Sequence, residues 1–387
     1  MIRWLLFRLQ GDKVIWVLFF LISLIGMLAV YSASSSLAFR AHGGAAEYLL
    51  LKHGGHLLIG FIVAFVIHLL DYRIFARFTN ALLFITIPLL VFTIAQGSEV
   101  NEAARWIEVF GQTFQTSDLA KITLIVYLAK LLTMRQEVIR DFTEGFLPAL
   151  FWVTVICGLI APSDLSTAAL MFLASLMVMF IAGVDLKYMG LLVLVALMGL
   201  SIMFSTAKRA QTWKSRIDAY VERIFDNEFN GDHQTLQAHL AIRTGGLLGK
   251  GSGNSTQRNF LPSANADYVF AIIVEEYGWV GGTFVIILYL LLLLRAVSVA
   301  TMSKTFGALL AAGLAFLLVL QAMMNMGVTV GLLPVTGLTL PFISWGGTSI
   351  LVSSVMMGII LSVSRDVVNS QKKTKGKSSS SRLRPTR

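Results

Sequence analysis

Charge is scarce in this sequence of 387 residues, because only 13% are Asp, Glu, Lys or Arg while 56% are apolar. A soluble domain carries about 25% charged and about 45–50% apolar residues. The chain therefore lacks the polar surface that water requires. Runs of roughly 20 apolar residues recur instead, which matches the ~30 Å hydrocarbon core of a bilayer. The composition predicts an all-α polytopic membrane protein.

Cysteine is nearly absent as well. The single cysteine, Cys157, lies inside an apolar run, so the chain has neither an intramolecular disulfide nor a thiolate metal cluster. The histidines indicate no metal site either, because His53 and His56 share a helix face without a third ligand. Redox chemistry and zinc chemistry are therefore not expected.

Ten apolar segments are candidate transmembrane helices. They cover residues 14–34, 54–70, 78–96, 117–134, 144–161, 166–184, 187–205, 267–294, 306–330 and 349–364. An even number of spans places both termini on one side of the membrane. Lys and Arg gather at one set of alternate loops and ends, and the positive-inside rule makes that set cytoplasmic.

These spans divide the chain into three parts. Residues 1–13 form a cytoplasmic N-terminus ahead of a first span that is too long for the core of a signal peptide. Residues 14–364 form the membrane domain. Residues 365–387 form a basic cytoplasmic tail, which we expect to be disordered from Gln371 because it is rich in Lys, Arg and Ser without apolar periodicity.

The extracytoplasmic face carries three notable segments, residues 97–116, 206–266 and 331–348. The large loop between spans 7 and 8, residues 206–266, exceeds ordinary connection lengths, which usually signals function or disorder. Because it contains residues such as Trp213 and Phe225, we expect it to be partly helical and folded against the membrane. Its net positive charge hints at an anionic ligand. Nucleic acid is not expected, since the basic residues are divided between two sides of a membrane.

Ionisable residues inside apolar spans are costly unless they are paired. Asp118 and Lys121 open the fourth span three residues apart, which places both on one helix face. They form either a structural ion pair or a site where Lys121 meets an anionic lipid headgroup, and both readings stay open. Asp164 lies in a turn between two spans. A capping role is favoured there, with a polar role at a cavity floor as the alternative.

Asp267 lies where the long loop enters the eighth span. It is placed either as an N-cap stabilised by the helix dipole or as a general base beside a roomy loop. Glu275 and Glu276 follow two turns later, where a carboxylate needs a partner or water. Upstream, glycines around Lys250 resemble an anion-binding loop. It is not a nucleotide-binding P-loop, because Lys250 is followed by glycine instead of Ser or Thr.

Several separated motifs recur in a known order. They are Ala104-Arg105-Trp106-Ile107, residues 115–121, 162–167, 245–257 and 261–270, Glu275-Glu276-Tyr277-Gly278, and residues 331–348. Together they resemble the shape, elongation, division and sporulation (SEDS) family of bacterial peptidoglycan polymerases over nearly the whole chain. Residues 337–347 resemble the division subgroup, FtsW, more than the elongation subgroup, RodA.

The chain also departs from the family pattern. Trp345 replaces a common Tyr, Thr116 a common Pro and Asp118 a common Glu, while Ser263, Asn265 and Ala266 stand where Glu, His and Thr are typical. Asp267 itself is kept. The resemblance therefore implies activity, with an altered setting for the Asp267 carboxyl group.

The resemblance implies a glycosyltransferase that polymerises lipid II, an undecaprenyl-pyrophosphate-linked disaccharide-peptide, outside the bacterial inner membrane during cell division. Asp267 would be the catalytic base. Substrate contacts are implied for Arg105, Trp106, Asp118, Lys121, Asp164, Gln234, Lys250, Gln257, Glu276 and Ser344. The implied partners are membrane lipid, a class B penicillin-binding protein transpeptidase and other division proteins at the septum. No cofactor is certain, and a divalent cation (Mg²⁺ or Mn²⁺) stays open.

Other functions fit the same pattern of spans. A lipid II flippase or another transporter would also use many spans and intramembrane charges. A scaffold that only recruits division proteins is a third reading, and an elongation role is the alternative within the family.

Overall fold

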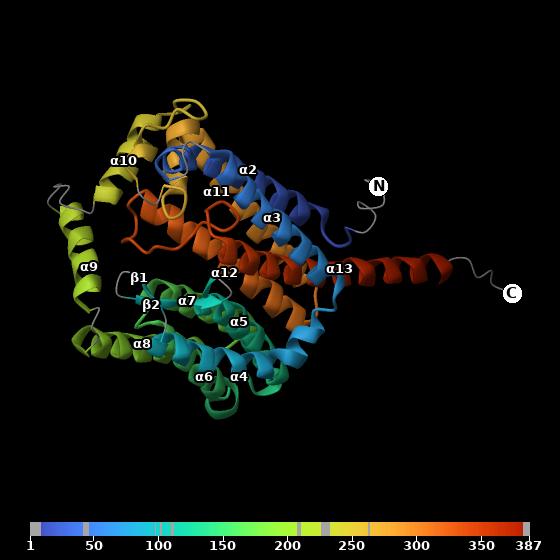
Figure 1. The fold of residues 1–387 in the computed structure, drawn as a ribbon. Helices are drawn as coiled ribbons and strands as arrows, with labels where there is room; N and C mark the ends of the chain where they lie inside the picture. Colours follow the sequence, from blue (N-terminus) through green and yellow to red (C-terminus); the bar gives the residue numbers. More distant parts are fainter. Residues whose placement is uncertain are drawn as a thin grey trace.

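The computed structural model describes residues 9–41, 46–96, 98–100, 103–109, 112–206, 210–225, 233–261 and 264–381. Over these residues the chain is a bundle of long helices (Figure 1). The helices that match the predicted spans are α2 (Lys13–Ala41), α3 (Ala46–Leu69), α4 (Arg73–Gln96), α5 (Thr116–Met134), α6 (Leu147–Ile160), α7 (Leu165–Ala182), α8 (Leu186–Thr206), α11 (Val269–Thr301), α12 (Thr305–Thr329) and α13 (Gly347–Ser381).

Nine helices of the described chain are long and apolar enough to cross a membrane. The predicted span outside that set is α5, which Asp118, Lys121 and Lys130 make more polar than the others. Helix α5 is nevertheless central, because it packs against α4, α7 and α12. Helix α2 begins and α13 ends on the same side of the bundle, at the right of Figure 1. The protein is a multi-pass membrane protein.

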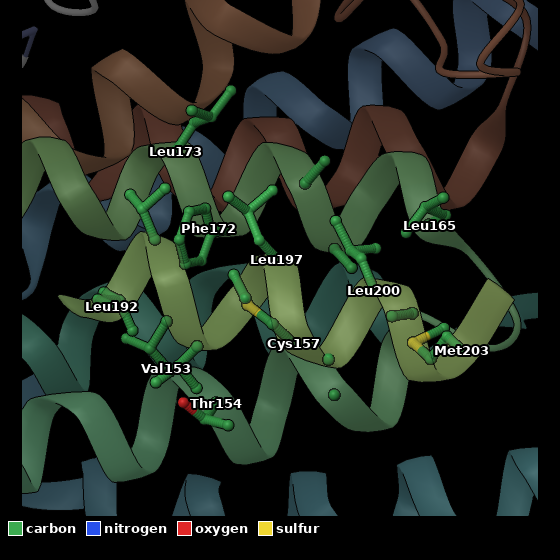
Figure 2. A pocket seen from close by; sticks show the side chains of 18 residues that line it. Val153, Thr154, Cys157, Leu165, Phe172, Leu173, Leu192, Leu197, Leu200 and Met203 are labelled. Carbon is green, nitrogen blue, oxygen red and sulfur yellow. The ribbon is translucent and has the colours of Figure 1, made fainter. Parts of the chain in front are cut away.

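Helix α8 stands apart from this bundle, since only 6% of the residues in its most apolar stretch are buried. Between α6, α7 and α8 lies an apolar cavity of about 320 Å³. Figure 2 shows Cys157, Phe172, Leu197 and Leu200 lining it. Apart from Thr154 and Cys157, the residues lining this cavity have apolar side chains or are glycines, as expected for a surface that faces lipid chains.

Residues 97–116, expected only as a loop, contain a three-stranded antiparallel sheet. Its strands are β1 (Ser98–Val100), β2 (Ala103–Val109) and β3 (Gln112–Gln115), in the order β1-β2-β3. Trp106 pairs with Gln115 in the register of β2 and β3. Because α5 begins at the next residue after Gln115, the sheet brings Trp106 close to the start of α5.

The long loop is partly helical, as predicted. It contains α9 (Ala210–Phe225), α10 (His233–Gly245) and a short 3-10 turn, η3 (Gln257–Asn259). Helix α9 is amphipathic: Trp213 is buried, whereas Lys214 and Asp218 on the same helix are exposed. Two other short turns, η1 (Gln136–Val138) and η2 (Phe142–Phe146), join α5 to α6.

Helix α11 is bent sharply at Gly278, whose φ of 69° and ψ of −172° are not helical. Gly282 lies against Val274 and Phe270, because a Cβ at Gly282 would stand 2.8 and 3.3 Å from their side chains. In a straight helix twelve residues rise about 18 Å. The part of α11 before Gly278 therefore folds back against the part after it, so the predicted eighth span is two helical pieces.

Helix α13 continues to Ser381, whereas the sequence indicated disorder from Gln371. A formed helix extends readily because each further residue adds one backbone hydrogen bond without a new nucleus. Lys residues in this stretch also have good helix propensity. Residues 382–387 of the predicted tail and residues 1–8 of the predicted N-terminus lie outside the described residues.

Candidate active site

A polar cavity of about 350 Å³ lies among the helices and the outer segments. Its lining comes from the sheet, α5, α7, α9, α12, the segments before α7, α11 and α13, and the first turn of α13. The lining residues are Trp106, Gln115, Asp118, Lys121, Asp164, Thr167, Arg216, Ala266, Asp267, Gln321, Thr336, Gly337, Leu338, Thr339, Trp345, Gly346, Thr348 and Ser349. Five of the residues predicted from the sequence thus share one cavity, namely Trp106, Asp118, Lys121, Asp164 and Asp267.

Asp118 and Lys121 form the buried ion pair that their spacing predicted. The Lys121 Nζ lies 2.8 Å from Asp118 Oδ1, and both side chains are about 95% buried, at 4–5% exposure. Lys121 also donates to Gln321 Oε1 at 3.1 Å. Gln321 in turn donates to the carbonyl oxygen of Thr339 at 2.9 Å. The ammonium group is therefore fixed in direction while it lines the cavity. The structural ion pair is confirmed, and contact of Lys121 with an anionic headgroup stays a prediction.

Asp164 caps α7, as predicted. Its Oδ1 accepts from the backbone N–H of Thr167 at 3.1 Å, and its Oδ2 accepts from the Thr167 hydroxyl at 2.9 Å. Gln115 also donates to Asp164 Oδ2 at 3.1 Å. Asp164 therefore both caps α7 and lines the polar cavity.

Asp267 is not the N-cap of α11, because Tyr268 occupies that position. Its backbone is held by α12, where Asn325 Nδ2 donates to the Asp267 carbonyl oxygen at 2.8 Å and to that of Leu338 at 2.6 Å. Gly337 lies beside the carboxylate, since a Cβ there would stand 3.9 Å from Asp267 Oδ2. Asp267 thus lines the cavity and does not occupy the N-cap position. Its role as a general base stays a prediction.

The two residues before Asp267 are held by the segment before α13. The backbone N–H of Trp345 donates to the Asn265 carbonyl oxygen at 2.7 Å, and the Ser344 hydroxyl donates to the Ala266 carbonyl oxygen at 2.5 Å. Three successive carbonyl oxygens therefore accept hydrogen bonds. Because these bonds use the backbone, they do not depend on the unusual side chains at Asn265 and Ala266. Ser263 lies outside the described residues.

Ser344 thus acts on the site through the backbone and is itself buried outside the cavity lining. Gln234 is on α10, also away from the lining. Arg105 belongs to β2, and its side chain is outside the described residues. Sequence reasoning missed Arg216, Gln321 and Asn325. A polar pair four residues apart in apolar α12 was the signal available for Gln321 and Asn325.

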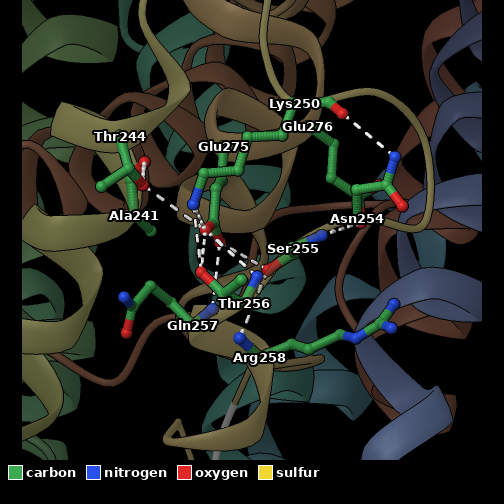
Figure 3. Close-up of polar contacts among 10 residues, drawn as sticks. All are labelled: Ala241, Thr244, Lys250, Asn254, Ser255, Thr256, Gln257, Arg258, Glu275 and Glu276. Carbon is green, nitrogen blue, oxygen red and sulfur yellow. Dashed lines mark hydrogen bonds and ion pairs between the residues drawn. The ribbon is translucent and has the colours of Figure 1, made fainter.

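Lys250, Gln257 and Glu276 form a second polar cluster, which Figure 3 shows around Glu275. Glu275, fully buried, accepts from Lys250 Nζ at 2.6 Å. It also accepts from the hydroxyl and amide of Thr256 at 2.8 and 3.1 Å. Glu276 accepts from Ser32 on α2 and from the Ser255 amide. These residues join the loop to α11 instead of lining the cavity.

Residues 246–251 of the same loop form hydrogen bonds with the backbone groups on both sides of the bend in α11. The amides of Trp279 and Val280 donate to the carbonyl oxygens of loop residues 246 and 247, at 3.0 and 3.3 Å. Loop amides of Lys250 and Gly251 donate back to carbonyl oxygens of α11 at 3.0 and 2.9 Å. In the glycine-rich segment predicted to bind an anion, the amides of Lys250 and Gly251 are therefore already hydrogen-bonded to α11.

The comparisons with known proteins agree with this architecture. The family model described as "Cell cycle protein", covering FtsW, RodA and SpoVE, matches residues 12–369. A protein of Geobacter sulfurreducens named "Probable peptidoglycan glycosyltransferase FtsW" is 37% identical over 359 residues, which is 91% of this chain and 95% of the relative. Stage V sporulation protein E of Bacillus subtilis is 33% identical over 367 residues, 92% of this chain and 98% of the relative.

Solved structures are similar as well. The Thermus thermophilus rod shape determining protein RodA superposes with a TM-score of 0.67 at 26% identity, covering 92% of this chain and 97% of that one. A chain from a structure titled "Structural coordination of polymerization and crosslinking by a peptidoglycan synthase complex" gives 0.71 at 27% identity, covering 92% and 98%. The chain therefore belongs to the SEDS family of FtsW, RodA and SpoVE.

Proposed function

We propose that the protein polymerises lipid II into glycan strands at the outer face of the bacterial inner membrane during cell division. The observation that carries the proposal is the shared cavity of Asp267 and Lys121, which joins a carboxylate to a fixed ammonium group. Polymerisation needs both groups, because a sugar hydroxyl must lose a proton while a pyrophosphate departs. The names of the curated relatives support the same activity.

Asp267 is the general base in this proposal. It takes the proton from the acceptor sugar hydroxyl as that oxygen attacks the anomeric carbon of the donor chain. The glycosidic bond forms as the bond from the anomeric carbon to pyrophosphate breaks. Lys121, with Arg105 as a further cation, stabilises the negative charge of the departing pyrophosphate. Trp106 packs against sugar or lipid at the cavity wall.

We also propose that a divalent cation, Mg²⁺ or Mn²⁺, assists this step. Among the described residues no three His, Cys, Asp or Glu side chains converge as a metal-binding group. Asp267 would therefore be its protein ligand, with pyrophosphate oxygens supplying the others, an oxygen set that suits a hard cation. The cation would supply positive charge to the leaving group.

The proposed partner is a class B penicillin-binding protein, whose transpeptidase activity would cross-link the new strands. The septum, with other division proteins, is the proposed location, because the name FtsW recurs among the relatives. An elongation role is the alternative, and the structural similarity to RodA supports it.

Two parallel assays separate polymerase, flippase and scaffold. Purified protein with its partner receives labelled lipid II, and glycan products are resolved by length, while a parallel vesicle assay follows movement of lipid II between leaflets. A polymerase lengthens glycan. Movement without lengthening identifies a flippase, and neither activity, under conditions that activate a related polymerase, leaves the scaffold.

A further inference from the structure

A cluster of cationic and aromatic side chains lies where α3 meets the segment before α13. The Lys52 Nζ stands 6.0 Å from the centre of the Trp345 ring. His53 stacks on Trp345 at 5.8 Å between ring centres, and His56 approaches its edge at 6.4 Å. Lys52 is exposed and His56 is partly exposed. Positive charge near an indole face is favourable, so Trp345 orients the Lys52 ammonium group.

This cluster borders the polar cavity. Trp345 lines the cavity, and its backbone amide holds the Asn265 carbonyl oxygen two residues before Asp267. Gly347 provides the room for His56, because a Cβ at Gly347 would stand 2.8 Å from the His56 Nε2. Trp345 therefore belongs both to the cluster on α3 and to the lining of the cavity that holds Asp267.

His53 has an unusual environment. It is fully buried, and neither of its ring nitrogens has a hydrogen-bond partner among the described residues. A buried polar group without a partner is costly, which points to a water molecule or ligand atom that completes it. Neighbouring Leu51 and Leu58 on α3 are strongly exposed apolar side chains. The cluster is thus next to a surface that lipid covers.

The charges of the cavity leave room for a second anion site. Lys121 is already neutralised by Asp118. Lys52 has no carboxylate within ion-pair distance in the described part of the chain. A polymerase of lipid-linked sugars must hold two pyrophosphates at once, one on the donor and one on the acceptor. Among the described residues the cavity lining supplies two cations, Lys121, which Asp118 pairs, and Arg216, which donates to the Val335 carbonyl oxygen. These two engaged cations are a poor match for two pyrophosphate groups.

We propose that Lys52, His56 and Trp345 form a second pyrophosphate subsite, which receives a lipid-linked sugar from the outer leaflet beside α3. This rests on the proposed function, because only polymerisation requires two lipid pyrophosphates. Lys52 and His56 donate charge-assisted hydrogen bonds to phosphate oxygens, and Trp345 holds both in place. His53, which is buried, stacks on the indole. Lys121, on the α5 side of the cavity, binds the other pyrophosphate.

The test counts bound undecaprenyl pyrophosphate. Full-length protein in phosphatidylcholine nanodiscs is titrated with this lipid, and bound copies are counted by native mass spectrometry. Wild type should bind two copies and the double variant Lys52→Gln/His56→Gln one copy. Each single variant should weaken the second binding step by about tenfold, as expected for losing one charged hydrogen bond. Lys52→Arg should keep two copies, and so should Lys214→Gln, which removes an exposed cation from α9.

Three results would overturn the subsite: one copy bound to wild type, two copies with unchanged affinity in the double variant, or equal binding of phosphatidylglycerol. The last result would mean that Lys52 binds anionic lipid headgroups without selecting pyrophosphate, as an interfacial lysine does. Thermal unfolding followed by tryptophan fluorescence verifies that each variant is folded. Polymerisation is assayed separately. Two bound copies without glycan formation would refute the proposed function alone, and glycan formation with an unchanged double variant would refute the subsite alone.

Discussion

Asn325 and Asp267 are joined by a hydrogen bond of 2.8 Å from the Asn325 side-chain amide to the Asp267 carbonyl oxygen. The same amide nitrogen donates to Leu338. Asn325 is 2% exposed, so no bulk water replaces these bonds. The position of the proposed base therefore depends on Asn325, a polar residue of apolar α12 that is not part of the cavity lining.

Asn325→Asp is expected to slow glycan formation with little change in KM. The substitution keeps the size of the side chain but replaces a donor with an acceptor, which faces two carbonyl oxygens. Losing a buried hydrogen bond of this kind costs about 1–3 kcal/mol. If that cost falls on the transition state, kcat drops by about 5- to 150-fold. Steady-state polymerisation measures it. A rise in KM at constant kcat would instead place Asn325 in substrate binding.

The Asp118–Lys121 pair offers a way to separate stability from catalysis. Lys121→Met alone should destabilise the protein by about 3–5 kcal/mol, because it leaves a buried charge unpaired. The double variant Asp118→Asn/Lys121→Met should recover much of that stability. Both should lack polymerase activity, since the leaving group loses its cation. Thermal unfolding and glycan synthesis are measured on the same samples.

Recovered activity in that double variant would show that the pair is only structural. A control on the same helix, α5, is Lys130→Met, which removes an exposed hydrogen bond from Lys130 to Asn80 of α4. That variant should be close to wild type in both measurements.

Gly249 and Gly253 form a matched pair for testing the bend of α11. Both have left-handed φ values, +81° and +79°. A Cβ at Gly249 would stand 2.1 Å from the Glu276 carbonyl oxygen, whereas a Cβ at Gly253 meets nothing within 4 Å. Gly253→Ala should cost only the strain of left-handed backbone, about 1–2 kcal/mol. Gly249→Ala should lose folded protein and activity together, as followed by detergent-stable yield. Equal effects of the two substitutions would contradict the loop-to-helix contact.

The proposed divalent cation predicts a dependence on chelators. EDTA should slow glycan formation, and Mg²⁺ or Mn²⁺ should restore it, because the cation offsets charge on the leaving pyrophosphate. Polymerisation rates before and after dialysis against EDTA measure the effect, with protein stability followed in parallel. Unchanged rates at low metal concentration would remove the cation from the account.

The long helices were predictable from the sequence. In lipid the backbone N–H and C=O groups of a long apolar run need hydrogen-bond partners within the run itself, and a helix supplies them. The Asp118–Lys121 pair and the Asp164 cap were also predictable, since each depends on residues three apart in the chain. The bend at Gly278 was not, because it is created by backbone contacts with a loop about thirty residues earlier. Lys250 and Glu276 belong to motifs that resemble the family, and contacts between distant parts of the chain use them to join the loop to the helices.

Residues from distant elements were the hardest to predict. Arg216 reaches the cavity from α9, where it donates to the Val335 carbonyl oxygen at 3.4 Å. Nothing in its local sequence distinguishes it from exposed Lys214 on the same helix. Trp345 joins α3 to the cavity through ring contacts with His53 and His56. Such meetings depend on how the helices pack, which periodicity alone does not encode.

The most direct measurement of the central claim compares Asp267→Asn with wild type in lipid II polymerisation by full-length protein and its partner. The amide keeps the size of the side chain but is no longer a base at neutral pH. Glycan formation should fall to the background rate, while thermal unfolding stays near that of wild type and Asp218→Asn, an exposed carboxylate on α9, keeps full activity. Glycan strands of normal length and rate from folded Asp267→Asn protein would contradict the account.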